Sequence, residues 1–302
     1  MSVQMLAARA ALRLRRLGAG PARPVDLERA AELRREDAHE PPRSVSRAHH
    51  CTATTIGGVP ATWIDQAHQQ AGVLVLLHGG AHVAGPFPDH WEHLARLCRA
   101  TGAAGLLVDH RRAPEHPYPA ALQDVLTVVD RLERERLLRD GAWGLVGDSA
   151  GGGLAVATAM RLRDGAGLPP AALVLSAPWL DLSADPTSLR SRARHDVLLT
   201  PEGVGHAATA YLGGHPATDP LVSPLHGDPH GLPPMAVHVG TRDLLLDQTR
   251  QWERRCREAG VAITVREQPG AIHGYVTGVA LLPEARRAAD EQAEFLREHL
   301  RA

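Results

Sequence analysis

The sequence predicts an α/β fold with a mostly parallel central sheet flanked by helices, and two features of the chain support this class. Short apolar runs alternate with longer amphipathic stretches, as in Val73–Leu77 followed by 89–101. Another pair, 143–146 followed by 150–163, is joined by a glycine-rich turn. Because each helix carries the chain back over the sheet, this order is typical of parallel strands covered on both faces.

The remaining elements continue this order after an initial hairpin. Segments 47–56 and 59–65 are rich in Thr and Val and flank Gly57 and Gly58, which predicts two strands joined by a tight turn. Apolar runs predict further strands, and amphipathic patterns predict helices. The strands are expected at 105–108, Ala172–Ser176, 235–239 and 262–267, and the helices at 120–138, 247–259 and 283–300.

One interval breaks the alternation. Between Ser176 and Met235 only Pro201–Leu212 resembles a helix, and no segment resembles a strand. An excursion of this length in a compact domain is usually a functional insertion. We therefore expect residues 1–45 to form N-terminal cap helices and residues 46–302 to form the main domain, with a cap insertion at about 184–231.

The N-terminal residues 1–17 combine Ala, Leu and Arg and are interpreted as an amphipathic helix that packs over the body of the protein. Four arginines interrupt every apolar stretch, so we expect neither a signal peptide nor a membrane span. These residues are Arg9, Arg13, Arg15 and Arg16.

Composition excludes several classes of partner. The chain has 302 residues, of which 33 are basic and 34 acidic, so neither a nucleic acid nor an anionic membrane surface is expected to bind it. Cys51, Cys98 and Cys256 are odd in number and far apart, which predicts neither a disulfide framework nor a zinc site. A reducing cytoplasm is the expected location.

The most informative motif is Gly-Asp-Ser-Ala-Gly-Gly at 147–152, which joins an apolar strand to a helix. A serine at the tip of such a turn has an exposed hydroxyl, while Gly147 and Gly151 remove side chains that would clash. Ser149 is therefore the predicted nucleophile. Because an unaided serine hydroxyl is a weak nucleophile, the chain must also supply a base, an acid and donors for an oxyanion.

A second motif, His-Gly-Gly-Ala at 78–81, follows the apolar strand Val73–Leu77. A glycine-rich loop after an early strand brings backbone N–H groups to the position of a tetrahedral oxyanion. Together with the serine turn, this loop predicts acyl chemistry.

These motifs resemble those of the α/β-hydrolases of the hormone-sensitive-lipase family, the bacterial carboxylesterases. The resemblance extends from about residue 60 to the C-terminus, and segments 232–234 and 282–286 are similar to those of its ε-lactone hydrolase branch. It implies the α/β-hydrolase fold and a serine hydrolase without metal or organic cofactor. The matching segments are 78–81, 108–109 with Arg111, 113–121, 147–152, 177–179 and 219–224.

The position of a histidine in the chain order identifies the predicted general base. His273 lies in a loop after the last apolar strand, where the fold and the H-G-[FY] motif of the family place the base. Asp243, after the strand at 235–239, is the predicted acid. Asp247 is the alternative, but it begins the next helix, where a capping carboxylate is expected. The order Ser149, Asp243, His273 is that of an α/β-hydrolase.

The resemblance implies that the backbone N–H groups of Gly80, Ala81 and Ala150 hold the oxyanion. Ala81 replaces the third glycine of the usual loop, so either this position is not left-handed or the loop has shifted. His82, His110 and Arg112 also depart from the family pattern, and either they make the substrate pocket more polar or they have no consequence.

Four residues are expected to bind substrate, although core packing remains an alternative reading of the aromatic ones. They are His82, Phe87, Trp91 and Trp179. Aromatic residues are scarce, with two Phe and three Tyr, which favours short or medium acyl chains over long lipids.

The predicted function is hydrolysis of a carboxylic ester or lactone through an acyl-enzyme on Ser149. Acyl transfer, lactonisation or elimination with the same triad is the alternative, and a non-catalytic binding protein is a remote one. Activity is expected to rise with pH near roughly 6 to 7 as His273 becomes neutral. The resemblance also suggests a homodimer formed through the strand at 262–267.

Overall fold

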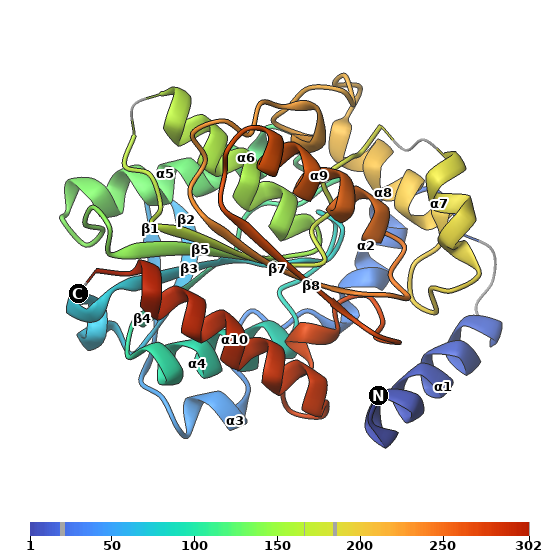
Figure 1. The fold of residues 1–302 in the computed structure, drawn as a ribbon, viewed down its shortest axis with the longest axis horizontal. Coiled ribbons are helices and arrows are strands. Elements are labelled where there is room, and N and C mark those ends of the chain that lie inside the picture. The colour runs from blue at the N-terminus through green and yellow to red at the C-terminus, as the bar shows by residue number, and fades with distance from the viewer. Residues whose placement is uncertain (19–21, 166, 184–185, 302) are drawn as a thin grey trace.

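The structure is a computed structural model that describes residues 1–18, 22–165, 167–183 and 186–301 and contains one eight-stranded sheet between two layers of helices (Figure 1). The strand order is β1-β2-β4-β3-β5-β6-β7-β8. β2 pairs antiparallel with both β1 and β4, and every other pair of neighbours is parallel. The predicted fold class and initial hairpin are therefore confirmed.

The strands are β1 (Cys51–Ile56), β2 (Val59–Ile64), β3 (Val73–Leu77), β4 (Ala104–Val108), β5 (Trp143–Asp148), β6 (Ala172–Ser176), β7 (Met235–Gly240) and β8 (Ile263–Gln268). The α-helices are α1 (Val3–Gly18), α2 (Leu27–Leu33), α3 (Arg43–Ser46), α4 (Pro88–Thr101), α5 (Ala120–Arg134), α6 (Ala150–Asp164), α7 (Pro186–Ala193), α8 (Pro201–Leu212), α9 (Leu246–Glu258) and α10 (Pro283–His299). Short 3₁₀ turns include η1 (Arg34–Glu36), η2 (Gln66–Ala71), η3 (Pro224–His226) and η4 (Tyr275–Thr277).

Alternate residues of the central strands fill two separate cores. In β3, Val73, Val75 and Leu77 pack with α5, α6 and α9, whereas Leu74 and Leu76 pack with α4 and α10. Figure 1 shows these two groups of helices on opposite faces of the sheet. Because both faces are buried, the strand is apolar at every position.

Two predicted boundaries are wrong for local reasons. α5 ends at Arg134 and not at 138, because Arg136 has a φ of 58° and the N–H groups of Leu137 and Leu138 turn back to the carbonyl of Leu132. β1 begins at Cys51 because the residues before it form α3 and a turn.

The long interval between β6 and β7 contains α7, α8 and η3, and no strand in the part that the structure describes. α8 matches the predicted helix exactly in its bounds. The Thr200 side chain accepts a hydrogen bond from the Gly203 N–H at 2.9 Å, and Pro201 occupies the first turn, which explains where this helix begins. α7 is not predicted from the sequence, and residues 184–185 before it lie outside the described residues.

The N-terminal segment forms the amphipathic helix α1 that the sequence predicts, and it buries Met5. Within the described ranges, no helix is long and apolar enough to cross a membrane. β8 lies at one edge of the sheet, as the suggested homodimer would require, and that homodimer stays a prediction.

Candidate active site

Ser149 occupies a strained turn between β5 and α6. Its φ of 52° and ψ of −117° lie in a region that residues with a side chain rarely adopt. The Ser149 N–H donates to the Ser176 carbonyl at 2.8 Å, and its own carbonyl accepts from the Trp179 N–H at 2.9 Å. Such strain costs on the order of 1–3 kcal/mol, and these bonds to the neighbouring strand end help to maintain it.

The glycines around Ser149 are required by close backbone contacts. A Cβ on Gly147 would lie 2.5 Å from the Gly151 carbonyl oxygen, and a Cβ on Gly151 would lie 2.0 Å from the Leu77 carbonyl oxygen. Both distances are far below van der Waals contact, so neither position accepts a side chain without a backbone shift. The Gly-x-Ser-x-Gly pattern is therefore a steric requirement of this turn.

The structure brings Ser149, His273 and Asp243 together from three separate strand ends. His273 Nε2 lies 2.9 Å from Ser149 Oγ, and His273 Nδ1 lies 2.9 Å from Asp243 Oδ2. Asp243 has no exposed surface, and its other carboxylate oxygen accepts the Leu245 N–H at 2.8 Å. The three side chains form one continuous hydrogen-bonded chain.

The electrostatics of His273 differ from the sequence-based expectation. Burial alone would lower its pKa, but the Asp243 charge and hydrogen bond outweigh burial and raise the pKa to about 9. The neutral imidazole, which can accept a proton, therefore forms at higher pH than the expected range of roughly 6 to 7.

Asp247, the alternative acid, lies apart from this chain. It occupies the first turn of α9, where a negative charge stabilises the helix, and pairs with Arg192 at 2.8 Å. A different residue, Asp196, supports the acid: its buried carboxylate accepts the Leu244 N–H at 2.7 Å. Sequence reasoning missed Asp196 because one aspartate in a polar insertion carries no distinctive pattern.

The loop after β3 has three consecutive residues with positive φ. The values are 111° for Gly80, 56° for Ala81 and 61° for His82. Of the two alternatives for Ala81, the one in which it avoids the left-handed region is therefore wrong. A left-handed residue with a side chain costs roughly 1–2 kcal/mol, so this loop is held in place by its surroundings.

His82 connects this loop to the insertion. Its buried ring stacks on Tyr211 of α8 with 3.7 Å between ring centroids, and lies 6.0 Å from the ring of Trp179. Trp179 is also buried, and its indole N–H donates to the Asp181 carbonyl at 2.9 Å. Tyr211 was not predicted as a site residue, because nothing in the sequence indicates its contact with a loop 130 residues earlier in the chain.

The other two predicted substrate-binding residues lie in α4 or just before it. Phe87 is half-buried and packs against the ring of His90 at 5.5 Å. Trp91 has no exposed surface, and its indole N–H donates to the Ala38 carbonyl at 2.7 Å. In this structure Trp91 therefore belongs to the core, the alternative that its sequence context left open.

His110 and Arg112 contact the two ends of the loop. The His110 ring stacks on His78 at 4.1 Å and has almost no exposed surface. Arg112 donates to Asp37 at 3.1 Å and to the Gly85 carbonyl. These contacts support the loop, and whether the two residues also make the substrate pocket more polar stays a prediction.

The N-terminal segment after α2 holds the same loop from outside. The Asp37 carboxylate accepts the Gly85 N–H at 2.7 Å, and the Arg34 guanidinium donates to the Val83 carbonyl at 2.7 Å. The Ala38 N–H donates to the Pro86 carbonyl at 2.6 Å. Residues far apart in sequence therefore fix a loop whose own backbone is strained.

Four buried histidines are neutral in the folded protein. Burial lowers the pKa of His82 to about 3 and that of His93 to about 4, and it also lowers the pKa values of His78 and His110. Each is an uncharged imidazole at neutral pH, and unfolding would expose it to water.

We expect acid to destabilise the protein through these histidines. Below about pH 6.5 the unfolded chain binds protons that the folded state excludes, so His82 and His93 each lower the free energy of unfolding by up to about 1.4 kcal/mol per pH unit, and His78 and His110 act in the same direction. His273 does not offset this loss, because it is protonated in both states there. Urea unfolding at about pH 6 and pH 5, where His273 is protonated in both states, measures the effect, and His82→Phe should reduce the slope. Equal unfolding midpoints at the two pH values would contradict the explanation.

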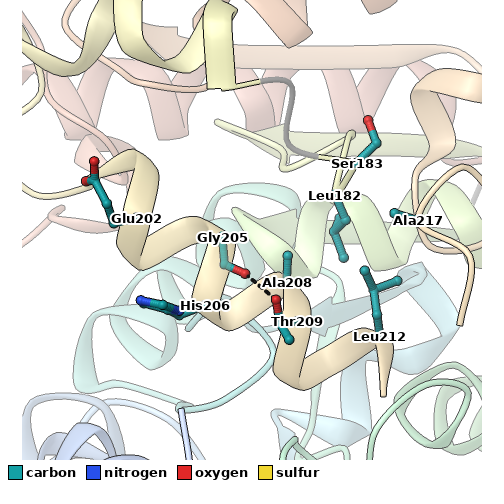
Figure 2. Close-up of a pocket in the computed structure, with 9 residues that line it drawn as sticks. All are labelled: Leu182, Ser183, Glu202, Gly205, His206, Ala208, Thr209, Leu212 and Ala217. Atoms are coloured by element: carbon teal, nitrogen blue, oxygen red, sulfur yellow. Dashed lines mark hydrogen bonds between the residues drawn. The ribbon is translucent and has the colours of Figure 1, made fainter. Parts of the chain in front are cut away.

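A pocket of about 490 Å³ lies along one side of α8 (Figure 2). Leu182, Ala208 and Leu212 give it an apolar wall, and Glu202 and Thr209 give it a polar rim. Among the described residues that line it, none belongs to the hydrogen-bonded chain at Ser149. The insertion therefore provides a cavity of its own next to the main domain.

Comparison with known proteins places this geometry in a family. Residues 74–277 match the family described as the alpha/beta hydrolase fold. An acetyl-hydrolase of Streptomyces hygroscopicus is 39% identical over 258 residues, covering 85% of this chain and 83% of that protein. An esterase of Acinetobacter venetianus is 32% identical over 241 residues, covering 80% of this chain and 79% of the esterase.

Solved structures agree with the sequence relatives. The structure of an esterase/lipase from an uncultured bacterium superposes with a TM-score of 0.89 at 29% identity, with all of both chains covered. An esterase from the bacterial hormone-sensitive lipase family gives a TM-score of 0.86 at 32% identity, covering 100% of this chain and 99% of that one. The chain therefore belongs to the α/β-hydrolase family, within its group of bacterial hormone-sensitive-lipase esterases.

Proposed function

We propose that this protein hydrolyses carboxylic esters of short to medium size through an acyl-enzyme on Ser149. The observation that carries the proposal is the hydrogen-bonded chain from Ser149 through His273 to Asp243, with 2.9 Å at each contact. The relatives named acetyl-hydrolase and esterase support the same reaction class. Lactones are cyclic esters and would follow the same steps.

The proposed reaction has two halves. Ser149 Oγ attacks the ester carbonyl carbon while His273 Nε2 takes the hydroxyl proton, and the protonated imidazole then gives this proton to the leaving alcohol. Water, deprotonated by His273, attacks the carbonyl carbon of the acyl-enzyme, and the imidazolium returns this proton to Ser149 Oγ as the acid is released. Asp243 accepts the Nδ1–H of His273 throughout, which fixes the tautomer and stabilises the imidazolium.

The backbone N–H groups of Gly80, Ala81 and Ala150 are the proposed donors to the oxyanion. Ala150 is the first residue of α6, so its N–H has no partner within the helix. Within the described part of the chain, none of the three N–H groups has a backbone acceptor. All three are thus available to a developing negative charge, and losing one such donor costs about two to three powers of ten in rate.

We predict that Asp37 and Arg112 act on turnover through this loop. Asp37→Asn keeps the size of the side chain but weakens its bonds to Gly85 and Arg112, so the strained loop relaxes and kcat should fall about tenfold with little change in KM. Steady-state kinetics with 4-nitrophenyl butyrate measures both constants.

Asp290→Asn is the matched control, because Asp290 pairs with Arg96 on the surface at 2.7 Å. Arg112→Leu should reproduce the loss seen in Asp37→Asn, and the double variant should lose little more, because both act on one loop. Additive losses, or a loss confined to KM, would show that the pair does not position the loop.

We further propose that the N-terminal helices and the insertion at about 184–231 form a cap that limits substrate size. Tyr211 of the insertion stacks on His82 of the loop, and the Arg16 side chain of α1 donates to the Asp196 carbonyl of the insertion, so the insertion contacts the loop and α1 contacts the insertion. The 490 Å³ pocket along α8 lies within the same insertion.

A panel of 4-nitrophenyl esters and lactones tests the proposed substrate range. We expect kcat/KM to be highest for acetate to butyrate and to decline by about tenfold or more at octanoate. A single methylene group in a pocket changes the activation free energy for kcat/KM by about 1–3 kcal/mol at most, and octanoate differs from butyrate by several such groups. Faster cleavage of octanoate than of butyrate would contradict the size limit, and absence of all ester cleavage would contradict the function.

A further inference from the structure

A second, polar pocket of about 370 Å³ lies beside the acid of the triad. Arg192 and His195 reach it from α7 and the segment after it, and Arg242 reaches it from the turn between β7 and α9. Ser191 and Thr241 add hydroxyl groups, and Asp247 is the carboxylate among the lining residues. Its lining therefore consists almost entirely of groups that can donate hydrogen bonds.

Positive charge is in excess in this pocket. Asp247 is shared between Arg192 at 2.8 Å and Arg250 at 3.6 Å, so its charge is already balanced. Among the described residues, Arg242 has no carboxylate partner. A guanidinium without a carboxylate partner in a concave site favours binding of an anion.

Helix α1 carries a further guanidinium, that of Arg9, which does not itself line the pocket. Burial and the charge of Arg242 both lower the pKa of Arg9. Its Nη1 lies 3.1 Å from Met1 Sδ, and its Nε is buried without a partner in the described chain. Arg16, two turns further along α1, anchors the helix to the Asp196 carbonyl. Because like charges repel, Arg9 adds to the positive potential that a bound anion at Arg242 would offset.

The pocket lies close to Ser149 along the contacts of the candidate triad. Arg242 adjoins Asp243, which contacts His273, which in turn contacts Ser149. Covalent geometry along this path puts the Cα of Arg242 within about 15 Å of Ser149 Oγ, and an arginine side chain reaches several ångströms further. The hydroxyl of Thr241 accepts the Gly270 N–H at 2.8 Å, which leaves its own hydrogen to donate.

We propose that this pocket binds a carboxylate or phosphate group carried by the ester substrate. The inference rests on the proposed function, because Ser149 must cleave the ester whose charged end occupies the pocket. Arg242 supplies the unbalanced charge, and Arg192 and His195 complete the set of donors. The substrate class is then an ester with an anionic group several bonds away from the carbonyl.

Matched pairs of esters test the proposal on the full chain. Mono-4-nitrophenyl glutarate against 4-nitrophenyl valerate places the charge on the acyl side, and 4-acetoxybenzoate against phenyl acetate places it on the alcohol side. We expect the ratio of kcat/KM for the charged to the neutral ester to fall about tenfold in Arg242→Met in at least one pair. Inorganic phosphate should inhibit cleavage of that charged ester more than cleavage of its neutral partner.

Arg254→Met is the matched control, because Arg254 is exposed on α9 outside the pocket. It should leave both ratios as in the wild type. Ratios that do not change in Arg242→Met in either pair would overturn the anion site while leaving ester hydrolysis intact. Absence of any ester cleavage by the wild type would instead refute the proposed function. Failure of the anion site and failure of the proposed function are therefore distinguishable.

Discussion

Ser149→Ala is expected to lower kcat for 4-nitrophenyl butyrate by about five to six powers of ten. The remaining rate is that of an enzyme which has lost its nucleophile. The reason is that removal of Oγ eliminates the acyl-enzyme, while the remaining groups can only bind and polarise the ester. KM should change little, because the hydroxyl contributes little to binding of the uncleaved ester. Rapid-mixing experiments should also show that the burst of 4-nitrophenol disappears.

The strained position of Ser149 makes a stability control necessary. Alanine at a φ of 52° suffers the same backbone cost as serine, so the melting temperature should remain close to that of the wild type. Ser46→Ala, at the exposed end of α3, is the matched control and should retain full turnover. Turnover in Ser149→Ala comparable to the wild type would exclude the proposed mechanism.

Asp243→Asn should give the second largest loss, about three to four powers of ten in kcat. An asparagine amide can donate to His273 Nδ1, which places the ring hydrogen on Nε2 and prevents it from accepting the Ser149 proton. The loss of kcat in Asp247→Asn should be at least about a hundredfold smaller than that in Asp243→Asn, because Asp247 makes no contact with His273 and pairs with Arg192. Equal losses in the two variants would reverse the assignment of the acid.

The pH dependence of kcat/KM provides an independent test of the same pair. Only neutral His273 can act as a base, and Asp243 raises its pKa to about 9, so activity should be lost as pH falls through this raised value. In Asp243→Asn the remaining influence of burial lowers the pKa, and the acidic limb of the residual activity should move to lower pH. A wild-type limb at or below pH 6.5 would show that Asp243 does not raise the pKa of His273.

The site was predictable from sequence where chemistry depends on local backbone geometry. Gly147, Ser149 and Gly151 are fixed by one sharp turn, and contacts of 2.0 and 2.5 Å for hypothetical Cβ atoms explain why the glycines must be there. Asp243 and His273 were found because strand ends follow a regular order along the chain. A motif of this kind can be recognised in a sequence because each of its residues is constrained by its immediate neighbours.

The contacts around Ala81 and His82 could not be predicted in the same way. Asp37, Arg34 and Arg112 each hydrogen-bond to the loop, and such contacts leave no periodic pattern in the sequence. Ala81 left open whether this position avoids left-handed backbone or the loop has shifted, and the structure has a left-handed residue there because the surrounding bonds outweigh its local preference.

The sequence by itself determined the class of the fold, the order of its elements and the nucleophilic turn, because hydrophobic period and glycine sterics act over a few residues. Tertiary structure decided that Arg34 and Asp37 contact the loop at 78–85 and that Tyr211 stacks on His82 of this loop. It also decided that Trp91 is core and that His110 and Arg112 contact the ends of the loop. These outcomes depend on contacts between distant segments, whose energies are set by packing and charge in three dimensions and leave no local pattern in the chain.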